Sequence, residues 1–190
     1  MFRCQIRMSQ KLIAFLGMPG SGKTEAITYV QEKYHCPKVY FGQITLDEVR
    51  RRGLEVNPKN EQIVRESLRD MFGEDYYARE IVKRIELLND VPIVLIESLY
   101  SWVEYEILKK NFGERFFAIT IHAAPSTRYA RLATRKERPL TREEAETRDI
   151  AQLKRFDQGM PIALSDRVIE NNGTVEIFHN RIDEAMKSLS

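Results

Sequence analysis

The segment that most constrains the fold is residues 17–24, which read Gly-Met-Pro-Gly-Ser-Gly-Lys-Thr. An apolar run at residues 12–16 precedes it, and helical periodicity follows from about Thr24. The spacing fits G-x-x-x-x-G-K-[ST], the phosphate-binding P-loop. Its glycines permit a turn whose N–H groups point inward as an anion nest, and the next helix adds the positive end of its dipole. A Gly-rich turn without a ligand is the alternative, but the strand and the helix both lie where the motif requires them.

The loop therefore predicts a nucleoside triphosphate site, with ATP as the expected ligand and GTP left open. Lys23 is expected to reach the β- and γ-phosphates, and the Thr24 hydroxyl is expected to ligate Mg²⁺. The residues expected to bind the nucleotide are those of the loop: Gly17, Met18, Pro19, Gly20, Ser21, Gly22, Lys23 and Thr24.

The composition constrains the size of the protein and the kinds of partner that it can bind. The chain has 190 residues, the size of one domain with a substantial core. Its net charge of +2 gives no argument for a nucleic-acid or membrane partner. Cys4 and Cys36 form no C-x-x-C pair, which fits a reducing compartment rather than a disulfide framework.

The apolar segments of the chain are short. None approaches the ~20 residues of a transmembrane helix, and residues 1–7 lack the apolar stretch of a signal peptide. We therefore expect a cytoplasmic protein with a flexible tail at residues 1–10, in which Met8 is a second candidate for the start codon.

Apolar runs alternate with helical patterns along the chain. The expected strands are residues 12–16, 38–41, 91–96, 116–122 and 166–170. The expected helices are residues 24–34, 47–53, 60–71 with Asn60 as N-cap, 75–88, 102–111, one opened by Pro125, one ending near Phe156, and 175–189. Strands that are apolar on both faces and alternate with helices predict an α/β fold with a parallel sheet covered on both sides.

Ligands bind at the carboxyl ends of the strands in such sheets. Gly17, Gly42, Glu97, His122 and Asn171 all lie at these ends. We therefore expect a single cleft to hold the chemistry.

The P-loop and four further segments together resemble the P-loop small-molecule kinases, which include the nucleoside monophosphate kinases and dephospho-coenzyme A kinase. The further segments are residues 51–55, 66–73, 119–132 and 165–171. The likeness runs over residues 11–189 and is closest to adenylate-kinase-like proteins related to dephospho-coenzyme A kinase. It implies a three-layer P-loop fold, in one domain over residues 1–190, with a five-stranded parallel sheet in the order 2-3-1-4-5. It also implies a helical acceptor-binding insert at residues 42–75 and a short lid at residues 135–148.

Arginines are expected to neutralise the transferred phosphoryl group, because phosphoryl transfer depends on positioning and positive charge. The best candidates are Arg135 and Arg138, since both lie close to Pro139, where the chain is expected to leave the helix and form the lid. Arg148 is a third candidate. The alternative for each arginine is a solvated helix face, because acidic residues are interleaved along this segment.

Two positions depart from the kinases that the chain resembles. Glu97 and Ser98 stand where these kinases carry Asp-Gly. In them the carboxylate can hold Mg²⁺ or accept a proton from the acceptor. Either Glu97 keeps this role in the present chain or the role is lost. Gln43 and Leu46 stand where relatives carry an acid and the arginine that grips the phosphate of the acceptor. The identity of the acceptor therefore stays open.

By the same resemblance, Asn172 belongs to the loop that passes the adenine.

The sequence leaves two candidate functions open. The first is ATP- and Mg²⁺-dependent phosphoryl transfer to a small, nucleotide-like acceptor by Lys23, Glu97, Arg135 and Arg138. The second is an ATP-binding regulatory or interaction protein with weak ATPase activity and no true acceptor. A membrane partner is not expected, nucleic acid lacks support, and the oligomeric state is open.

Overall fold

The computed structural model describes residues 10–189. The tail expected at residues 1–10 therefore lies outside the described residues except for Gln10, and there the prediction is wrong. Gln10 is buried, and its side-chain amide donates a hydrogen bond of 3.2 Å to the carbonyl of Val91. This contact ties the start of the first strand to the loop before the third.

Five parallel strands form one sheet in the order β2-β3-β1-β4-β5, which confirms the order that the resemblance implies. The strands are β1 (Lys11–Leu16), β2 (Lys38–Tyr40), β3 (Ile93–Glu97), β4 (Phe116–His122) and β5 (Arg167–Glu170). The central strand β1 pairs with β3 on one side and with β4 on the other. Every residue from Leu12 to Leu16 is buried, which explains why this run is apolar without alternation.

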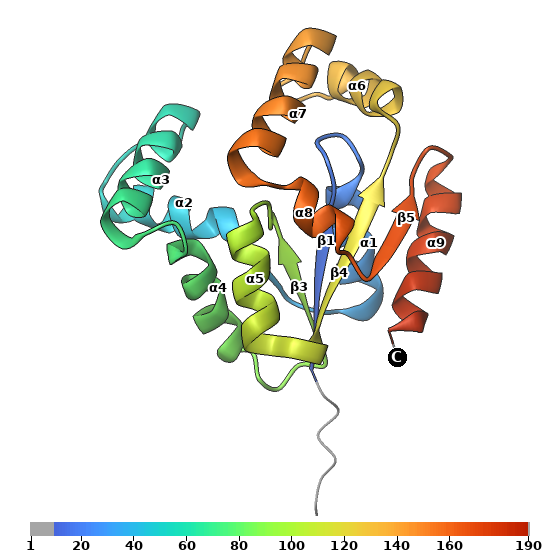
Figure 1. Cartoon of the computed structure of the whole chain (residues 1–190), viewed down its shortest axis with the longest axis horizontal. Helices are drawn as coiled ribbons and strands as arrows, with labels where there is room; N and C mark the ends of the chain where they lie inside the picture. The colour runs from blue at the N-terminus through green and yellow to red at the C-terminus, as the bar shows by residue number, and fades with distance from the viewer. Residues whose placement is uncertain (1–9, 190) are drawn as a thin grey trace, which may run out of the picture.

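Helices cover both faces of the sheet and make three layers (Figure 1). They are α1 (Lys23–Tyr34), α2 (Phe41–Arg51), α3 (Pro58–Phe72), α4 (Tyr76–Glu86), α5 (Trp102–Phe112), η1 (Gly113–Arg115), α6 (Pro125–Thr134), α7 (Arg142–Phe156), α8 (Gly159–Ala163) and α9 (Val175–Ser188). One core packs Ile13 and Phe15 of the sheet against α1 and α9, and the other packs Leu12 and Ala14 against the side of α2 to α5.

The segment after β2 differs from the prediction. A strand to residue 41 and a helix over residues 47–53 were expected, but α2 starts at Phe41 directly after the strand. Phe41, Ile44 and Val49 are buried along one face of α2, so the helical period extends back through Gly42. Gly42 therefore lies inside a helix and does not close the strand.

The N-cap of α3 was also placed wrongly. The cap is Asn57, whose side-chain oxygen accepts a 2.9 Å hydrogen bond from the backbone N–H of Asn60. Pro58 occupies the first turn, where its missing N–H costs nothing, so the helix begins two residues before the expected start. The short helix α8 was not expected at all.

All five strands point their carboxyl ends toward one edge of the sheet, where the P-loop lies. Between residues 10 and 189, no helix is both long and apolar enough to cross a membrane.

Candidate functional site

The P-loop is packed so closely that its glycines cannot be replaced. Gly17 has φ 135°, and a β-carbon there would lie 2.3 Å from the carbonyl oxygen of Ile121. Gly22 has φ 108°, and a β-carbon there would lie 2.3 Å from the side-chain nitrogen of Asn171. The loop therefore needs glycine both for its left-handed backbone and for contact with β4 and the loop after β5.

Lys23 is the first residue of α1, and its ammonium group is folded over the loop. Its Nζ donates to the carbonyls of Gly17 and Met18 at 2.7 and 3.1 Å. Burial and, to a smaller extent, the positive charges of Arg148 and Arg128 together lower the pKa of Lys23 to about 8. An anion bound at this point would relieve that cost, which is what a phosphate site requires.

A cavity of about 310 Å³ opens beside the loop, and we call it the donor cavity. It is lined by Pro19, Gly20, Gly22, Lys23, Thr24, Tyr100, Arg131, Leu132, Arg135, Arg148 and Gln152. Nη1 of Arg131 is buried and has no hydrogen-bond partner among the described residues. A buried donor without an acceptor is costly, so the arginines and the loop amides fit a polyanion such as a nucleoside triphosphate.

A buried ion pair holds the P-loop against α6 and α7. Two nitrogens of Arg128 donate to the carboxylate of Asp149 at 3.1 and 2.6 Å, and both side chains are almost fully buried. Arg128 also donates to the carbonyls of Pro19 and Ala123. It therefore positions the loop and does not line the donor cavity, in contrast to Arg131, Arg135 and Arg148.

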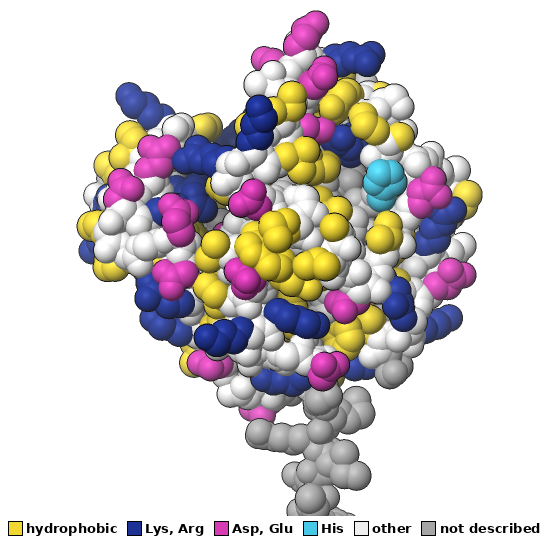
Figure 2. Space-filling view, viewed as in Figure 1, with side chains coloured by type: hydrophobic (Ala, Val, Ile, Leu, Met, Phe, Trp, Pro, Cys, Tyr) yellow, Lys and Arg dark blue, Asp and Glu magenta, His cyan; other side chains and the backbone are white. Residues whose placement is uncertain are grey.

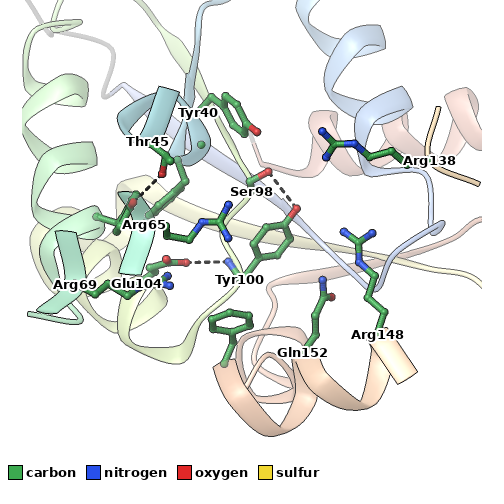
Figure 3. Close-up of a pocket in the computed structure, with 14 residues that line it drawn as sticks. Tyr40, Thr45, Arg65, Arg69, Ser98, Tyr100, Glu104, Arg138, Arg148 and Gln152 are labelled. Atoms are coloured by element: carbon green, nitrogen blue, oxygen red, sulfur yellow. Dashed lines mark hydrogen bonds between the residues drawn. The ribbon is translucent and has the colours of Figure 1, made fainter. Parts of the chain in front are cut away.

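A second cavity of about 320 Å³ lies beyond the first, between α3, the end of β3 and α7 (Figure 3). We call it the acceptor cavity. It is lined by Tyr40, Phe41, Gly42, Thr45, Arg65, Arg69, Tyr77, Ser98, Tyr100, Glu104, Arg138, Arg148, Gln152 and Phe156. Four of these residues are arginines and one is an acid. Figure 2 shows Lys and Arg side chains gathered at the rim of the hollow between α3 and α7.

The single acid of the acceptor cavity, Glu104, is hydrogen-bonded to the backbone at the start of α5. Its Oε2 accepts hydrogen bonds from the backbone N–H groups of Tyr100 and Ser101 at 2.9 and 3.0 Å, and it forms the capping box of α5. Burial raises the pKa of Glu104, which opposes the effect of these hydrogen bonds. Glu104 thus fixes the backbone that carries Tyr100.

Ser98 stands in the left-handed region with φ 65°, a conformation that favours glycine. Its hydroxyl lies 3.2 Å from the hydroxyl of Tyr100 (Figure 3). The backbone here has a shape that glycine adopts most readily, and the serine adds a hydroxyl to the cavity.

The two cavities meet at Tyr100, Arg148 and Gln152, which line both. Arg148 and Gln152 lie one turn apart on α7, so one face of this helix borders both cavities. The arrangement can place a group in the acceptor cavity next to phosphates held by the P-loop.

The lid arginines lie in different cavities. Arg135 lines the donor cavity and Arg138 lines the acceptor cavity, and Nε of Arg135 donates to the carbonyl of Arg138. The third candidate, Arg148, is the one that lines both. Residues 142–148 of the expected lid belong to α7.

Gly17, Met18 and Ser21 of the P-loop line neither cavity, and the same holds for two expected site residues outside the loop, Glu97 and Asn172. The carboxylate of Glu97 forms an ion pair of 2.8 Å with Lys38. The side chain of Asn172 accepts from the backbone N–H of Ala124 and donates to Glu170. Its neighbour Asn171 contacts the P-loop instead, since its side-chain amide donates to the carbonyl of Ser21 at 2.8 Å.

Sequence reasoning missed Gln152, Tyr77, Phe156 and the partner of Arg128. One signal was available: Arg148, Gln152 and Phe156 are spaced by four residues, which places them on one face of a helix. No local signal pairs Arg128 with Asp149 across two helices.

Comparison with known proteins places this site in a family. A family model described as an AAA domain matches residues 13–152. The UPF0200 protein MJ1399 of Methanocaldococcus jannaschii is 34% identical over 181 residues, which cover 94% of this chain and 90% of that protein. The UPF0200 protein MmarC7_0527 of Methanococcus maripaludis is 34% identical over 182 residues, covering 94% and 97%.

Solved structures of small-molecule kinases share the fold. A gluconokinase from Sinorhizobium meliloti has a TM-score of 0.61 at 13% identity, covering 96% of this chain and 94% of that one. A shikimate kinase from Acinetobacter baumannii, in complex with shikimate, has a TM-score of 0.57 at 19% identity with the same coverage. At these identities the likeness shows the P-loop fold and leaves the acceptor undetermined.

Proposed function

The chain belongs to the AAA domain family and to the UPF0200 proteins, and on that premise we propose that it is an ATP-dependent phosphotransferase acting on a small anionic acceptor. The observation that carries the proposal is the meeting of two arginine-lined cavities at Tyr100, Arg148 and Gln152. A protein that only binds or hydrolyses ATP has no need of the second cavity. A nucleotide-like molecule is one acceptor of suitable charge.

The P-loop would hold the triphosphate, with Lys23 moving from the loop carbonyls to the β- and γ-phosphates. Arg148 would face the transferring phosphoryl group, because it borders both cavities. Arg135 on the donor side and Arg138 on the acceptor side would add positive charge. One well-placed arginine can accelerate phosphoryl transfer by about 10³–10⁵.

Mg²⁺, when bound, would neutralise charge on the β- and γ-phosphates. The Thr24 hydroxyl is the protein ligand that we propose, with Glu97 acting through water from the end of β3. Among residues 10–189, no group of three or more His, Cys, Asp or Glu side chains could hold a metal. This fits a metal whose ligands come mainly from phosphates and water.

The Lys23→Ala variant tests the proposal. It should lose acceptor-stimulated ADP release, measured with ATP and Mg²⁺ against AMP, CMP, GMP, dephospho-coenzyme A, shikimate and gluconate. Lys110→Ala is the matched control, because Lys110 is exposed on α5 and lines neither cavity. Undiminished phosphoryl transfer by the Lys23 variant would contradict the mechanism.

A regulatory ATP-binding protein is the second candidate, and one observation favours it. The side chain of Gln43 donates to Asp47 at 2.7 Å and does not line the acceptor cavity, so that position offers nothing to an acceptor. This candidate predicts ATP binding with slow hydrolysis that none of the six acceptors accelerates.

A further inference from the structure

We propose that the group phosphorylated is a hydroxyl, carried by a small acceptor whose anionic group is held by Arg65 and Arg69. The inference rests on the proposed function and names the chemistry of its acceptor. It is drawn from the distribution of charged and neutral polar groups within the acceptor cavity, together with two buried polar atoms that have no partner.

The wall of the cavity farthest from the P-loop carries two arginines of α3. Arg65 and Arg69 are one turn apart, and in Figure 3 both lie on the wall opposite Arg138 and Arg148. The guanidinium of Arg69 stacks 5.2 Å from the ring of Tyr77 and 5.6 Å from that of Phe156, which fixes its position. These contacts hold a positive charge against the cavity away from the P-loop.

Arg69 has unused hydrogen-bonding capacity. Its Nε is buried and makes no hydrogen bond within the described chain. The nearest carboxylate, that of Glu74, lies 3.5 Å away on a side chain that is 78% exposed, so solvent screens this attraction. An anionic group bound in the cavity would supply the missing acceptor, and a guanidinium suits carboxylate and phosphate equally.

The end of the cavity next to the donor site presents Arg148 together with neutral polar groups. Tyr100 and Gln152 line both cavities, and the Ser98 hydroxyl lies 3.2 Å from that of Tyr100. Oε1 of Gln152 is buried without a donor among residues 10–189. A ligand hydroxyl can donate a hydrogen bond to this oxygen. An ionised phosphate has only acceptor oxygens, so it would place an acceptor against an acceptor.

The left-handed backbone at Ser98 supports the same assignment. A glycine would adopt φ 65° more readily, and the serine adds a hydroxyl to the acceptor cavity beside Tyr100, which lines both cavities. Ser98 and Tyr100 together can orient a hydroxyl by giving and accepting hydrogen bonds. Neither side chain is charged, and the positive charge at this junction comes from Arg148, which would face the transferring phosphoryl group.

In the transfer step, a bond forms between the acceptor oxygen and the γ-phosphorus. The bond between the γ-phosphorus and the β,γ-bridging oxygen breaks, and ADP leaves with that electron pair. The hydroxyl proton passes to water. The product is a phosphate monoester, whereas transfer to an acceptor phosphate would give a phosphoanhydride.

The size of the cavity limits the acceptor. About 320 Å³ lies near the lower end of the ~300–1,000 Å³ usual for small-molecule pockets. A compact hydroxy acid or a hydroxyl-bearing phosphate ester meets these requirements.

The test compares two sets of acceptors with the full chain, ATP and Mg²⁺. Shikimate, gluconate and dephospho-coenzyme A carry a hydroxyl and an anion, whereas AMP, CMP and GMP also offer a terminal phosphate. We expect ADP release to rise with a member of the first set, and phosphorus NMR to identify the product as a monoester. A phosphoanhydride product would overturn this inference while leaving the proposed function standing. No stimulation by any of the six would overturn both.

Variants of the arginines test the anion end. Arg69→Gln should raise KM for the stimulating acceptor by about 10- to 100-fold, the loss of one charge-assisted hydrogen bond, with KM for ATP unchanged. If the Arg69 variant fails to fold, Arg65→Gln tests the same end of the cavity, and it too should raise KM for the acceptor. Arg51→Gln is the control, because Arg51 is exposed and pairs with Glu48 outside the cavity. An unchanged acceptor KM in both cavity variants would refute the assignment.

Discussion

The buried ion pair between Arg128 and Asp149 gives the sharpest prediction about stability. The carboxylate of Asp149 accepts three hydrogen bonds, two from Arg128 and one from the hydroxyl of Tyr129 at 3.1 Å. The side chains of Arg128 and Asp149 are 6% and 9% exposed. Replacing Asp149 by Asn keeps the shape but leaves the charge of Arg128 buried without its counter-ion.

Breaking a buried pair in this way costs about 3–5 kcal/mol, because the remaining charge is not solvated. For a chain of this length, each kcal/mol corresponds to about 2–4 °C in Tm, so Asp149→Asn should lower Tm by about 6–20 °C. Urea unfolding followed by circular dichroism measures the free energy directly.

An exposed pair is the matched control. Arg155 and Glu66 lie 3.9 Å apart with side chains 62% and 47% exposed, and Glu66→Gln should change the unfolding free energy by less than about 0.5 kcal/mol. Replacing Arg128 and Asp149 together by Met and Leu should cost less than Asp149→Asn, because no charge stays buried. A loss below about 1 kcal/mol in Asp149→Asn would refute the reasoning.

Two further predictions concern the cavities. Ser98→Gly should raise the free energy of unfolding, measured in urea, by about 1 kcal/mol, because glycine relieves the strain of the left-handed backbone. Ser98→Ala is the control and should not raise it. Equal free energies of unfolding for the two variants would contradict the strain. Because the pKa of Lys23 is lowered to about 8, the lysine loses its proton as pH rises through 8, and ATP affinity in calorimetric titrations should fall by up to about tenfold per pH unit above it. Lys23→Met should bind weakly at every pH, and a pH-independent affinity in the unaltered chain would contradict the shift.

The sheet could be predicted because its information is local. The strands β1, β3 and β4 are short, mainly apolar runs, and the order β2-β3-β1-β4-β5 followed from the resemblance that the P-loop carries. Boundaries were less secure where two signals compete. After β2, the apolar run ends in Phe41, which serves equally as a strand residue or as the first buried residue of α2.

The site was harder to predict because its contacts join distant segments. Asn171 and Asn172 are adjacent and chemically identical, yet only Asn171 reaches the P-loop, since alternate residues after a strand point to opposite sides. Glu97 ends β3 as expected, and its carboxylate forms an ion pair with Lys38 on the neighbouring strand. Neither partner can be read from spacing along the chain.

The two consecutive residues Arg148 and Asp149 explain how α7 serves the site. Asp149 points into the core, where Arg128 links it to the carbonyl of Pro19 in the P-loop. Arg148 points to the two cavities. The ion pair therefore fixes the distance between the P-loop and Arg148, and a lid motion that included Arg148 would have to break a buried charge pair. In the proposed mechanism, any lid motion would be confined to the segment before α7 that carries Arg135 and Arg138, and Arg148 would be the fixed positive charge between donor and acceptor.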